Sequence, residues 1–571
     1  MQGLSFFHDR ILQIWYNTYV MDKNQLRENA ITEYRRWLTA AEGDEQLKAE
    51  LLELQENEDE LIDSFSQHLK FGTSGLRGIL GPGTNRLNTY VVRRTTQGFA
   101  NYLRKNLEKP SVVIAYDTRK NSRLFAEETA KVLRGNDVGV YLFPKLATVS
   151  LLSYAIGALG CDMGIMITAS HNPKIYNGYK VYNKDGYQII GSVADAILEE
   201  ISKVDFFDEI AVSDDGILDV PDQVGEDFVD DIIGFLPVPD KETLNCIHAV
   251  YTPLNGTGNS YVRKVLARIG YENLEIVSSQ EDPDENFTTC SSPNPEKITA
   301  FAEGFKVLND VNADIIIATD PDCDRVGACI RHGGMNALIT GNQLGALMLD
   351  YLCQVKPPKA GQMVIKSIVT TPLTERIARG NGLEMVNTLT GFKYIGEMIT
   401  ELRSRGEGWR YYFGCEESHG YLMDGFIRDK DGVSAAALVL CMAAYHKARG
   451  KDLVERLREL NEIYGTCKDK TRNFEFYGPY AGIAMTKVME YFREHVKDTI
   501  AGKRIVEITD YLGETGLPKS DVLKYVLEDG TELIIRPSGT ETKIKVYFFE
   551  SSSDGALEKE IKSMIESFKD C

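Results

Sequence analysis

The stretch Met163-Gly-Ile-Met-Ile-Thr-Ala-Ser-His-Asn-Pro173 decides the fold class. Its first five residues are almost all apolar, as in a strand that is buried on both faces of a parallel sheet. The run stops at Thr168, and Pro173 prevents a helix from following. Ser170 is therefore predicted to lie on a loop just past the carboxyl end of a buried strand, where open α/β sheets place their chemistry. Most serines at such turns only bond their own backbone, so the rest of the chain must decide its role.

Length and charge narrow the classes of protein that this chain can belong to. At 571 residues it is too long for one hydrophobic core, and 43% hydrophobic with 26% charged residues is typical of a soluble globular protein. The net charge of -20 argues against nucleic acid or an anionic membrane as a partner, but an acidic protein can still hold a basic pocket for a small anion.

Cysteine usage and hydropathy predict a cytoplasmic protein. The 10 cysteines form no C-x-x-C pair, and several of them, such as Cys353 and Cys441, lie in apolar runs that predict buried thiols of a reducing compartment. The segment Phe6–Tyr19 carries Asp9 and Arg10 and fits neither a secretory signal nor a membrane span.

Short apolar runs that end in polar turns recur along the chain. One set precedes small polar turns: Val112–Tyr116, Cys246–Tyr251 and Met363–Val369. A second set precedes loops with chemically capable residues: Met163–Ile167 before Ser170, Asp314–Ala318 before Asp320, and Tyr411–Phe413 before Glu416. Helical patterns lie between them, as at Ser122–Leu133 and Gly341–Leu352. This predicts one α/β unit used three times with diverged sequence.

The two ends of the chain differ from this middle part. Apolar residues at helical spacing between Leu26 and Leu61 predict helices packed outside the first domain. Near the other end, Val526–Ile535 predicts a hairpin with an Asp-Gly turn, Lys543–Phe549 a strand and Leu557–Phe568 a closing helix. The predicted divisions are a helical extension over 1–65, domains at 66–215, 216–335 and 336–463, and an α+β domain at 464–571.

Asp320-Pro-Asp-Cys-Asp324 places three carboxylates at alternate positions after a buried strand. Crowded anions repel unless a cation sits among them, and an all-oxygen ligand set suits Mg²⁺ better than Zn²⁺. An EF-hand is rejected because Arg325 and Arg331 stand where it needs Gly and Glu. The plain alternative is a solvated acidic turn.

Three further polar stretches each admit two interpretations. Phe71-Gly-Thr-Ser-Gly-Leu-Arg-Gly78 is either a tight turn or a loop that lets Arg77 approach an anion, and it lacks the Rossmann spacing. Glu416-Glu-Ser-His419 suits either sugar hydroxyls or a helix cap. Arg536-Pro-Ser-Gly-Thr-Glu-Thr-Lys543 is either a phosphate cradle or a polar hairpin loop.

Five motifs in a fixed order carry a family resemblance: Thr168-Ala-Ser-His-Asn-Pro173, Asp320-x-Asp-x-Asp-Arg325, Gly391-Phe-Lys393, Glu416-Glu-Ser418 and Arg536-Pro-Ser-Gly-Thr540. From about Phe71 to its end the chain resembles the α-D-phosphohexomutase superfamily, and within it the phosphoglucomutase branch. The resemblance implies three consecutive similar α/β domains with mixed sheets plus a C-terminal α+β domain, arranged around a central cleft. It also implies a phosphoserine enzyme that moves a phosphoryl group within a sugar phosphate.

The resemblance assigns roles to residues that match the family motifs. Ser170 would carry the phosphoryl group, with Arg77, His171 and Arg325 around it, and Lys180 and Lys430 as acid/base candidates. Mg²⁺ would bind Asp320, Asp322, Asp324 and the phosphoryl oxygen on Ser170. Glu416, Ser418 and Gly391-Phe392-Lys393 would hold the sugar, and Arg536, Ser538, Gly539 and Thr540 the phosphate that does not react.

Several functions agree with this pattern. The leading hypothesis is interconversion of glucose 1-phosphate and glucose 6-phosphate through glucose 1,6-bisphosphate, by a monomer or homodimer. Alternatives are the same chemistry on ribose, deoxyribose or mannose phosphates, a metal-assisted serine phosphatase, and an inactive sugar-phosphate sensor, against which the intact Ser170 argues. Asn255 replaces a family histidine, so its loop receives no catalytic role, and His419 is a hypothetical specificity residue.

Overall fold

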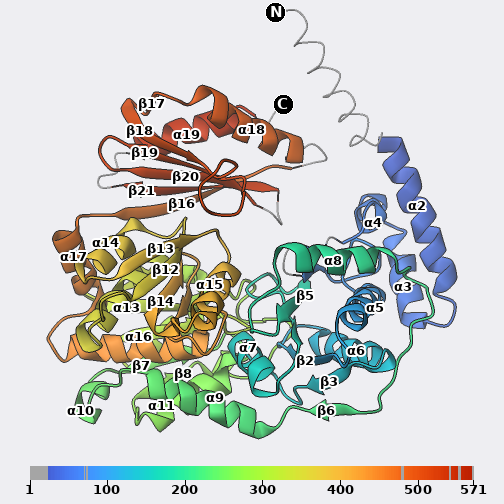
Figure 1. Cartoon of the computed structure of the whole chain (residues 1–571), viewed down its shortest axis with the longest axis horizontal. Helices are drawn as coiled ribbons and strands as arrows, with labels where there is room; N and C mark the ends of the chain where they lie inside the picture. The colour runs from blue at the N-terminus through green and yellow to red at the C-terminus, as the bar shows by residue number, and fades with distance from the viewer. Residues whose placement is uncertain are drawn as a thin grey trace, which may run out of the picture. The chain divides into compact units, whose positions relative to one another are not determined.

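The computed structural model describes residues 23–69, 71–72, 75–477, 481–538, 542–550 and 555–568. The segment Phe6–Tyr19 lies outside them. The chain forms two compact units (Figure 1). The first unit comprises the chain up to Pro144 with Cys161–Tyr182 and Ile189–Val220, and the second comprises Lys145–Gly160, Asn183–Gln188 and the chain from Pro221 onward.

The first unit is built on a six-stranded sheet in the order β1-β5-β4-β2-β3-β6. Its strands are β1 (Gly75–Ile79), β2 (Ser111–Tyr116), β3 (Gly139–Leu142), β4 (Met163–Ile167), β5 (Tyr176–Asn183) and β6 (Ile217–Asp219). Its helices are α5 (Thr89–Asn106), α6 (Ser122–Gly135) and α8 (Gly191–Ser202). Parallel pairing of β2 with β3 and β4, and complete burial of β4, confirm the doubly buried strand that the sequence predicts.

Three helices precede this sheet: α2 (Lys23–Ala40), α3 (Glu45–Leu54) and α4 (Glu58–Phe65). The Trp37 ring is fully buried and lies 5.4 Å from the rings of Phe206 and Phe207, centroid to centroid. Arg86 pairs with Asp63 at 2.7 Å. The predicted packing of N-terminal helices against the first domain is confirmed.

The second unit contains two further mixed sheets. One has the order β11-β10-β9-β7-β8 and consists of β7 (Ala249–Thr252), β8 (Leu274–Ile276), β9 (Ile315–Thr319), β10 (Val326–His332) and β11 (Met335–Ile339). Its helices are α9 (Asp222–Phe235), α10 (Lys241–Leu244), α11 (Gly258–Arg268) and α12 (Ala302–Asp310), and α7 (Val149–Ala158) also belongs to this unit.

The other sheet has the order β13-β12-β14-β15. Its strands are β12 (Met363–Ser367), β13 (Glu384–Thr388), β14 (Tyr411–Glu416) and β15 (Gly420–Leu422). The helices of this part of the chain are α13 (Gly341–Val355), which precedes the strands, α14 (Pro372–Gly380), α15 (Phe392–Ser404), α16 (Gly432–Lys447) and α17 (Leu453–Tyr464).

The three sheets repeat one arrangement, which confirms the predicted threefold use of a single α/β unit. Each contains the same run of four adjacent strands: β3-β2-β4-β5, then β8-β7-β9-β10, then β13-β12-β14-β15. In each run the first pair and the second pair are parallel. The loop that joins the last two strands holds Ser170 in the first repeat, Asp320–Asp324 in the second and Ser418 in the third.

The last sheet is antiparallel throughout, with the order β16-β21-β20-β19-β18-β17. It consists of β16 (Lys468–Glu475), β17 (Thr499–Ile500), β18 (Lys503–Asp510), β19 (Leu523–Leu527), β20 (Glu532–Pro537) and β21 (Lys543–Glu550). One face packs on α18 (Ala481–His495) and α19 (Ala556–Glu566), as Figure 1 shows. The predicted hairpin and α+β domain are confirmed, whereas the residue limits of the domains remain predictions.

Candidate active site

Ser170 occupies a strained turn between β4 and β5. Its φ is 52°, in the left-handed region that non-glycine residues rarely adopt, and the residue is only 3% exposed. The Ser170 N–H donates to Thr168 Oγ1 at 2.8 Å, and Ser170 Oγ lies 3.1 Å from His171 Nδ1. The backbone thus fixes the hydroxyl next to an imidazole.

Arg119, on the loop that follows β2, supports this turn through hydrogen bonds. Its guanidinium donates to four backbone carbonyl oxygens of the loop, those of Ser170, Asn172, Pro173 and Tyr176. Asp117 lies 3.4 Å from Arg119 Nε, and both side chains are fully buried. Asp117 also accepts from Thr168 Oγ1 at 2.6 Å and from Ser122 Oγ at 2.7 Å. Burial raises the pKa of the Asp117 carboxyl, and the Arg119 charge opposes this shift.

Two paired strands of the first unit, β1 and β5, carry two further cations. Arg77, on β1, donates to Asn172 Oδ1 at 3.2 Å, so its side chain contacts the loop that carries Ser170 and His171. Lys180, on β5, is buried and stands opposite Gly75 in the ladder. A side chain at Gly75 would place its Cβ 1.9 Å from the Tyr179 carbonyl oxygen, so this close strand contact requires glycine.

The second unit contains the acidic loop between β9 and β10. Asp320, Asp322 and Asp324 are all buried, and each offers one carboxylate oxygen within 4.8 Å of the others. Cys323 between them has φ 53°, and Asp320 Oδ1 accepts the N–H groups of Asp324 and Arg325 at 3.1 and 3.0 Å. Three buried oxygen donors at this spacing fit Mg²⁺, so a solvated turn is excluded.

Three segments support the acidic loop through its backbone. The Val149 N–H at the start of α7 donates to the Asp322 carbonyl, and the Gly432 N–H at the start of α16 donates to the Cys323 carbonyl, both at 3.0 Å. The Thr257 N–H donates to the Pro321 carbonyl at 2.8 Å. The Asn255 loop, which received no catalytic role, therefore acts as support for the acidic loop.

Two cations balance these carboxylates. Arg325 Nε lies 3.7 Å from Asp324 and 4.0 Å from Asp320, and its guanidinium also pairs with Glu296. Lys430 Nζ lies 3.2 Å from both Asp324 and Asp429. Burial alone would lower the pKa of Lys430, but the charges of Asp324, Asp429 and Glu416 raise it. Lys430 is thus a fixed cation in this arrangement.

The third repeat contributes the predicted sugar-binding residues. Glu416 is buried at the end of β14, and its Oε1 accepts the Gly391 N–H at 2.7 Å. Burial and the charge of Glu417 raise the pKa of Glu416 to about 7. Gly391, with φ 121°, caps α15, which begins at Phe392; the Phe392 ring lies 5.6 Å from Lys430 Nζ. Burial lowers the pKa of Lys393 to about 8.

Ser418 and His419 form the turn after β14. Ser418 is half-buried, and His419, with φ 64°, is left-handed like Ser170 and Cys323 in the other repeats. His419 Nδ1 lies 3.0 Å from the Val326 carbonyl oxygen, and the Val326 N–H donates to the His419 carbonyl at 3.1 Å. His419 therefore joins the third-repeat turn to the acidic loop, and only its other ring nitrogen remains for the hypothetical contact with a sugar.

The last domain carries the predicted phosphate-binding residues, and two carboxylates of the preceding domains, Glu417 and Glu296, act on its Lys545. Arg536, on β20, pairs in the ladder with Lys545 on β21, and the Ser538 N–H donates to the Lys543 carbonyl at 2.8 Å. Burial lowers the pKa of Lys545, while the charges of Glu417 and Glu296 act in the opposite direction. Gly539 and Thr540 lie outside the described residues.

Sequence reasoning missed the groups that support the predicted residues. Arg119 and Asp117 appear in the sequence only as a polar turn, and Glu296 and Lys545 belong to no motif. The sequence offers a signal only for Lys545 and Tyr547. They follow the motif residue Lys543 at every second position of β21, so all three side chains lie on the same face of the sheet as Arg536.

The fold and these loops define a class: a multidomain α/β enzyme with three equivalent turns, one of which holds a buried carboxylate group suited to a metal ion. The domain models of phosphoglucomutase/phosphomannomutase match in order: α/β/α domain I at residues 68–208, domain II at 226–334, domain III at 340–464 and the C-terminal domain at 492–567. The chain belongs to the α-D-phosphohexomutase superfamily and is a phosphohexomutase, an isomerase.

Individual relatives agree with this assignment. The phosphoglucomutase of Staphylococcus epidermidis is 35% identical over 513 residues, which cover 86% of this chain and 92% of the relative. Two solved structures share the fold at 20% identity and a TM-score of 0.67. They are a phosphoglucomutase/phosphomannomutase family protein from Burkholderia thailandensis, with 87% of this chain and 97% of that chain covered, and the phosphoglucomutase parafusin from Paramecium in its open form, with 88% and 96% covered. No helix among the described residues is long and apolar enough to cross a membrane.

Proposed function

We propose that this phosphohexomutase is a phosphoglucomutase that interconverts glucose 1-phosphate and glucose 6-phosphate. The observation that supports it most is the equivalence of the three turns. The serine turn, the acidic turn and the turn after Glu416 occupy the same place in three copies of one fold unit. The preference for glucose over another sugar is supported by the relatives named phosphoglucomutase.

Ser170 is the proposed carrier of the phosphoryl group. Its phosphorus–Oγ bond breaks as the group moves to the free hydroxyl of glucose 1-phosphate, which gives glucose 1,6-bisphosphate and a free serine. In the return step the serine hydroxyl attacks the phosphoryl group on C1, the bond between that phosphorus and the C1 oxygen breaks, and glucose 6-phosphate leaves with the proton that the base took from the serine. A serine needs a base for this, and His171 Nδ1 at 3.1 Å can accept the hydroxyl proton. Lys180 is the second acid/base candidate in the first unit.

The carboxylates of Asp320, Asp322 and Asp324 would hold Mg²⁺, with an oxygen of the phosphoryl group on Ser170 as a further ligand. The ion would supply charge stabilisation for the phosphoryl group in transfer. Arg77 and Arg325 would stabilise the same charge from the protein, and Lys430, which stays protonated, would add a third cation.

The sugar and the phosphate that does not react need separate contacts. The Glu416 carboxylate would accept hydrogen bonds from the sugar hydroxyls, and the Ser418 hydroxyl would donate to or accept from them, with Lys393 nearby. Arg536, Ser538, Gly539 and Thr540 would bind the distant phosphate. One site must act on both ends of the sugar. The distant phosphate therefore needs a fixed binding site, on a domain that can open while the intermediate turns.

A substrate panel tests the proposal. The wild-type chain is assayed with Mg²⁺ and catalytic glucose 1,6-bisphosphate on the 1-phosphates of glucose, mannose, ribose and deoxyribose. We expect the largest kcat/KM for glucose 1-phosphate. A larger value for another sugar would reassign the substrate, and net release of inorganic phosphate would identify a phosphatase.

The serine is tested separately. Ser170→Ala should lose nearly all turnover, and it should lack the added phosphoryl mass of about 80 Da that the purified wild-type enzyme is expected to carry on this serine. Ser202→Ala, at the exposed end of α8, is the matched control and should keep both. Substantial mutase activity in Ser170→Ala would contradict the mechanism.

A further inference from the structure

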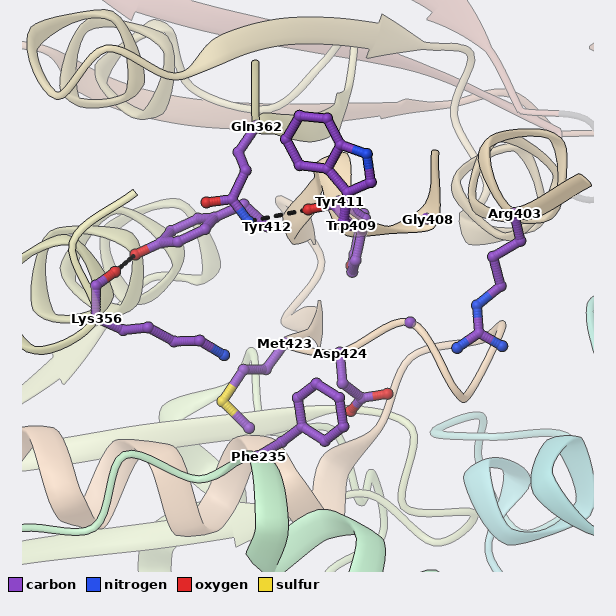
Figure 2. A pocket seen from close by; sticks show the side chains of 11 residues that line it. Phe235, Lys356, Gln362, Arg403, Gly408, Trp409, Tyr411, Tyr412, Met423 and Asp424 are labelled. Atoms are coloured by element: carbon purple, nitrogen blue, oxygen red, sulfur yellow. Dashed lines mark hydrogen bonds between the residues drawn. The ribbon is translucent and has the colours of Figure 1, made fainter. Parts of the chain in front are cut away.

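A cavity of about 400 Å³ lies in the second unit, and none of the predicted site residues lines it. Figure 2 shows its walls: aromatic rings of Phe235, Trp409 and Tyr412, and the charged side chains of Lys356, Arg403 and Asp424. Its volume falls within the range of small-molecule sites, which are apolar with a few placed polar groups. The cavity therefore has the size and composition of a ligand pocket.

Two cations enter this cavity without a protein counterion. Lys356 Nζ lies 5.3 Å from the centre of the Phe235 ring, and no carboxylate of the described residues forms an ion pair with it. The same holds for Arg403 among those residues. Figure 2 shows the two side chains reaching into the cavity from opposite sides. An anion that enters the cavity would therefore meet positive charge that no carboxylate of the described residues pairs with.

Asp424 has one carboxylate oxygen to which no described protein group donates. The residue is only 1% exposed. Its Oδ1 accepts the N–H groups of Phe426 and Ile427 at 3.0 and 3.4 Å. Its Oδ2 is buried and has no hydrogen-bond partner among the described residues. Native proteins rarely leave a buried carboxylate oxygen unsatisfied, so this oxygen requires a donor that the described protein atoms do not supply.

An exposed indole completes the cavity. Trp409 is 56% exposed although it is a large apolar side chain, and its carbonyl oxygen is fixed by the Gln362 side-chain amide at 3.0 Å. Tryptophan at the edge of an aromatic cavity offers a flat surface on which a planar ring can stack. A simple sugar phosphate or inorganic anion would leave that surface uncovered.

We propose that this cavity binds a nucleoside monophosphate. The base would stack on Trp409 and donate an N–H to Asp424 Oδ2, while the phosphate would pair with Lys356 and Arg403. The pocket is a site separate from the proposed sugar-phosphate site, and the proposal does not depend on which sugar the enzyme converts.

Binding can be measured on the full-length enzyme by calorimetry with AMP, GMP and UMP. Saturating glucose 1-phosphate is present throughout, so that the mutase site is occupied. We expect saturable binding of at least one nucleotide, at least tenfold weaker in Lys356→Met and in Arg403→Met. Lys359→Met, an exposed lysine close in sequence, is the matched control and should bind as the wild type does. Asp424→Asn should change the order of affinity among the three bases.

Tryptophan fluorescence gives a second measurement that locates the ligand. The chain has three tryptophans, and Trp37 is fully buried. The nucleotide should quench wild-type emission, and Trp409→Phe should lose most of that quenching. The proposal is overturned if no nucleotide binds saturably, if Lys356→Met and Arg403→Met bind normally while keeping the wild-type melting temperature, or if ribose 5-phosphate binds as tightly as the nucleotides.

Discussion

At the residue scale, the least replaceable interaction around Ser170 is the buried pair of Asp117 and Arg119. Arg119 satisfies four loop carbonyls, so the conformation of the nucleophile depends on one guanidinium. Removing one partner of a fully buried pair leaves an unpaired charge and costs about 3–5 kcal/mol. We expect Arg119→Met to lower the free energy of unfolding in urea by this amount, and to lower kcat more than KM.

The double variant separates the two effects. Asp117→Asn combined with Arg119→Met removes both charges, so it should recover part of the stability lost in Arg119→Met. It should not recover turnover, because the loop carbonyls still lack their donor. Recovery of turnover together with stability would show that Arg119 supports the fold and not the serine.

Asp424 gives a prediction about pH at the same scale. Burial and the charge of Asp431 raise its pKa from 3.8 to about 7 in the folded protein. A raised carboxyl pKa means that the unfolded chain loses its proton first, so this group costs the fold stability as the pH rises from about 4 to about 7. The difference of about 3 pH units corresponds to about 4 kcal/mol.

The measurement compares Asp424→Asn with the wild type in urea at pH 5 and pH 7. Relative to the wild type, the variant should be more stable at pH 7 than it is at pH 5, because it has no proton to lose. An equal difference at both values would mean that the folded carboxyl titrates in its ordinary range.

At the scale of elements, the strands and the threefold repeat could be predicted because buried parallel strands are short, apolar and bounded by polar turns. Met163–Ile167 is an example, since the predicted and observed limits agree. The supporting contacts could not be predicted in this way. Arg119 reaches its carbonyls across 51 to 57 residues of sequence, and the left-handed turns at Ser170, Cys323 and His419 carry no glycine that would reveal them.

The start of α16 illustrates how one element positions another. Gly432 is buried, and a Cβ there would lie 2.6 Å from the Cys323 carbonyl oxygen, within the acidic loop. Gly432→Ala should therefore displace the loop and raise the Mg²⁺ concentration needed for half-maximal mutase activity by about tenfold, an effect of about 1.4 kcal/mol. Gly234→Ala, in α9, is the control, because nothing lies within 4 Å of its added Cβ. Unchanged Mg²⁺ dependence in Gly432→Ala would mean that the start of α16 can move away from the acidic loop without displacing it.

At the scale of the whole molecule, the last domain is attached through an apolar contact and contributes a charged one. Ile534, Tyr547 and Phe549 of its sheet pack on Ile368 and Leu389 of the preceding domain. This contact holds β20 and β21, and hence Arg536 and Lys545, on the side where the charges of Glu417 and Glu296 act. An anionic phosphate bound there could accept from both cations at once, and such charge-assisted hydrogen bonds are strong.

Arg536→Ala tests whether this domain anchors the distant phosphate. A charge-assisted contact to phosphate contributes about 1.5–3 kcal/mol, so its loss should raise KM by about 10- to 100-fold and release more of the bisphosphate intermediate into solution. Arg504→Ala, an exposed arginine on β18 of the same sheet, should leave both unchanged. Intermediate release is followed by trapping labelled glucose 1,6-bisphosphate during turnover. If Arg536→Ala lowers kcat without raising KM or releasing the intermediate, the arginine acts on the transferring group and the anchor must be sought elsewhere.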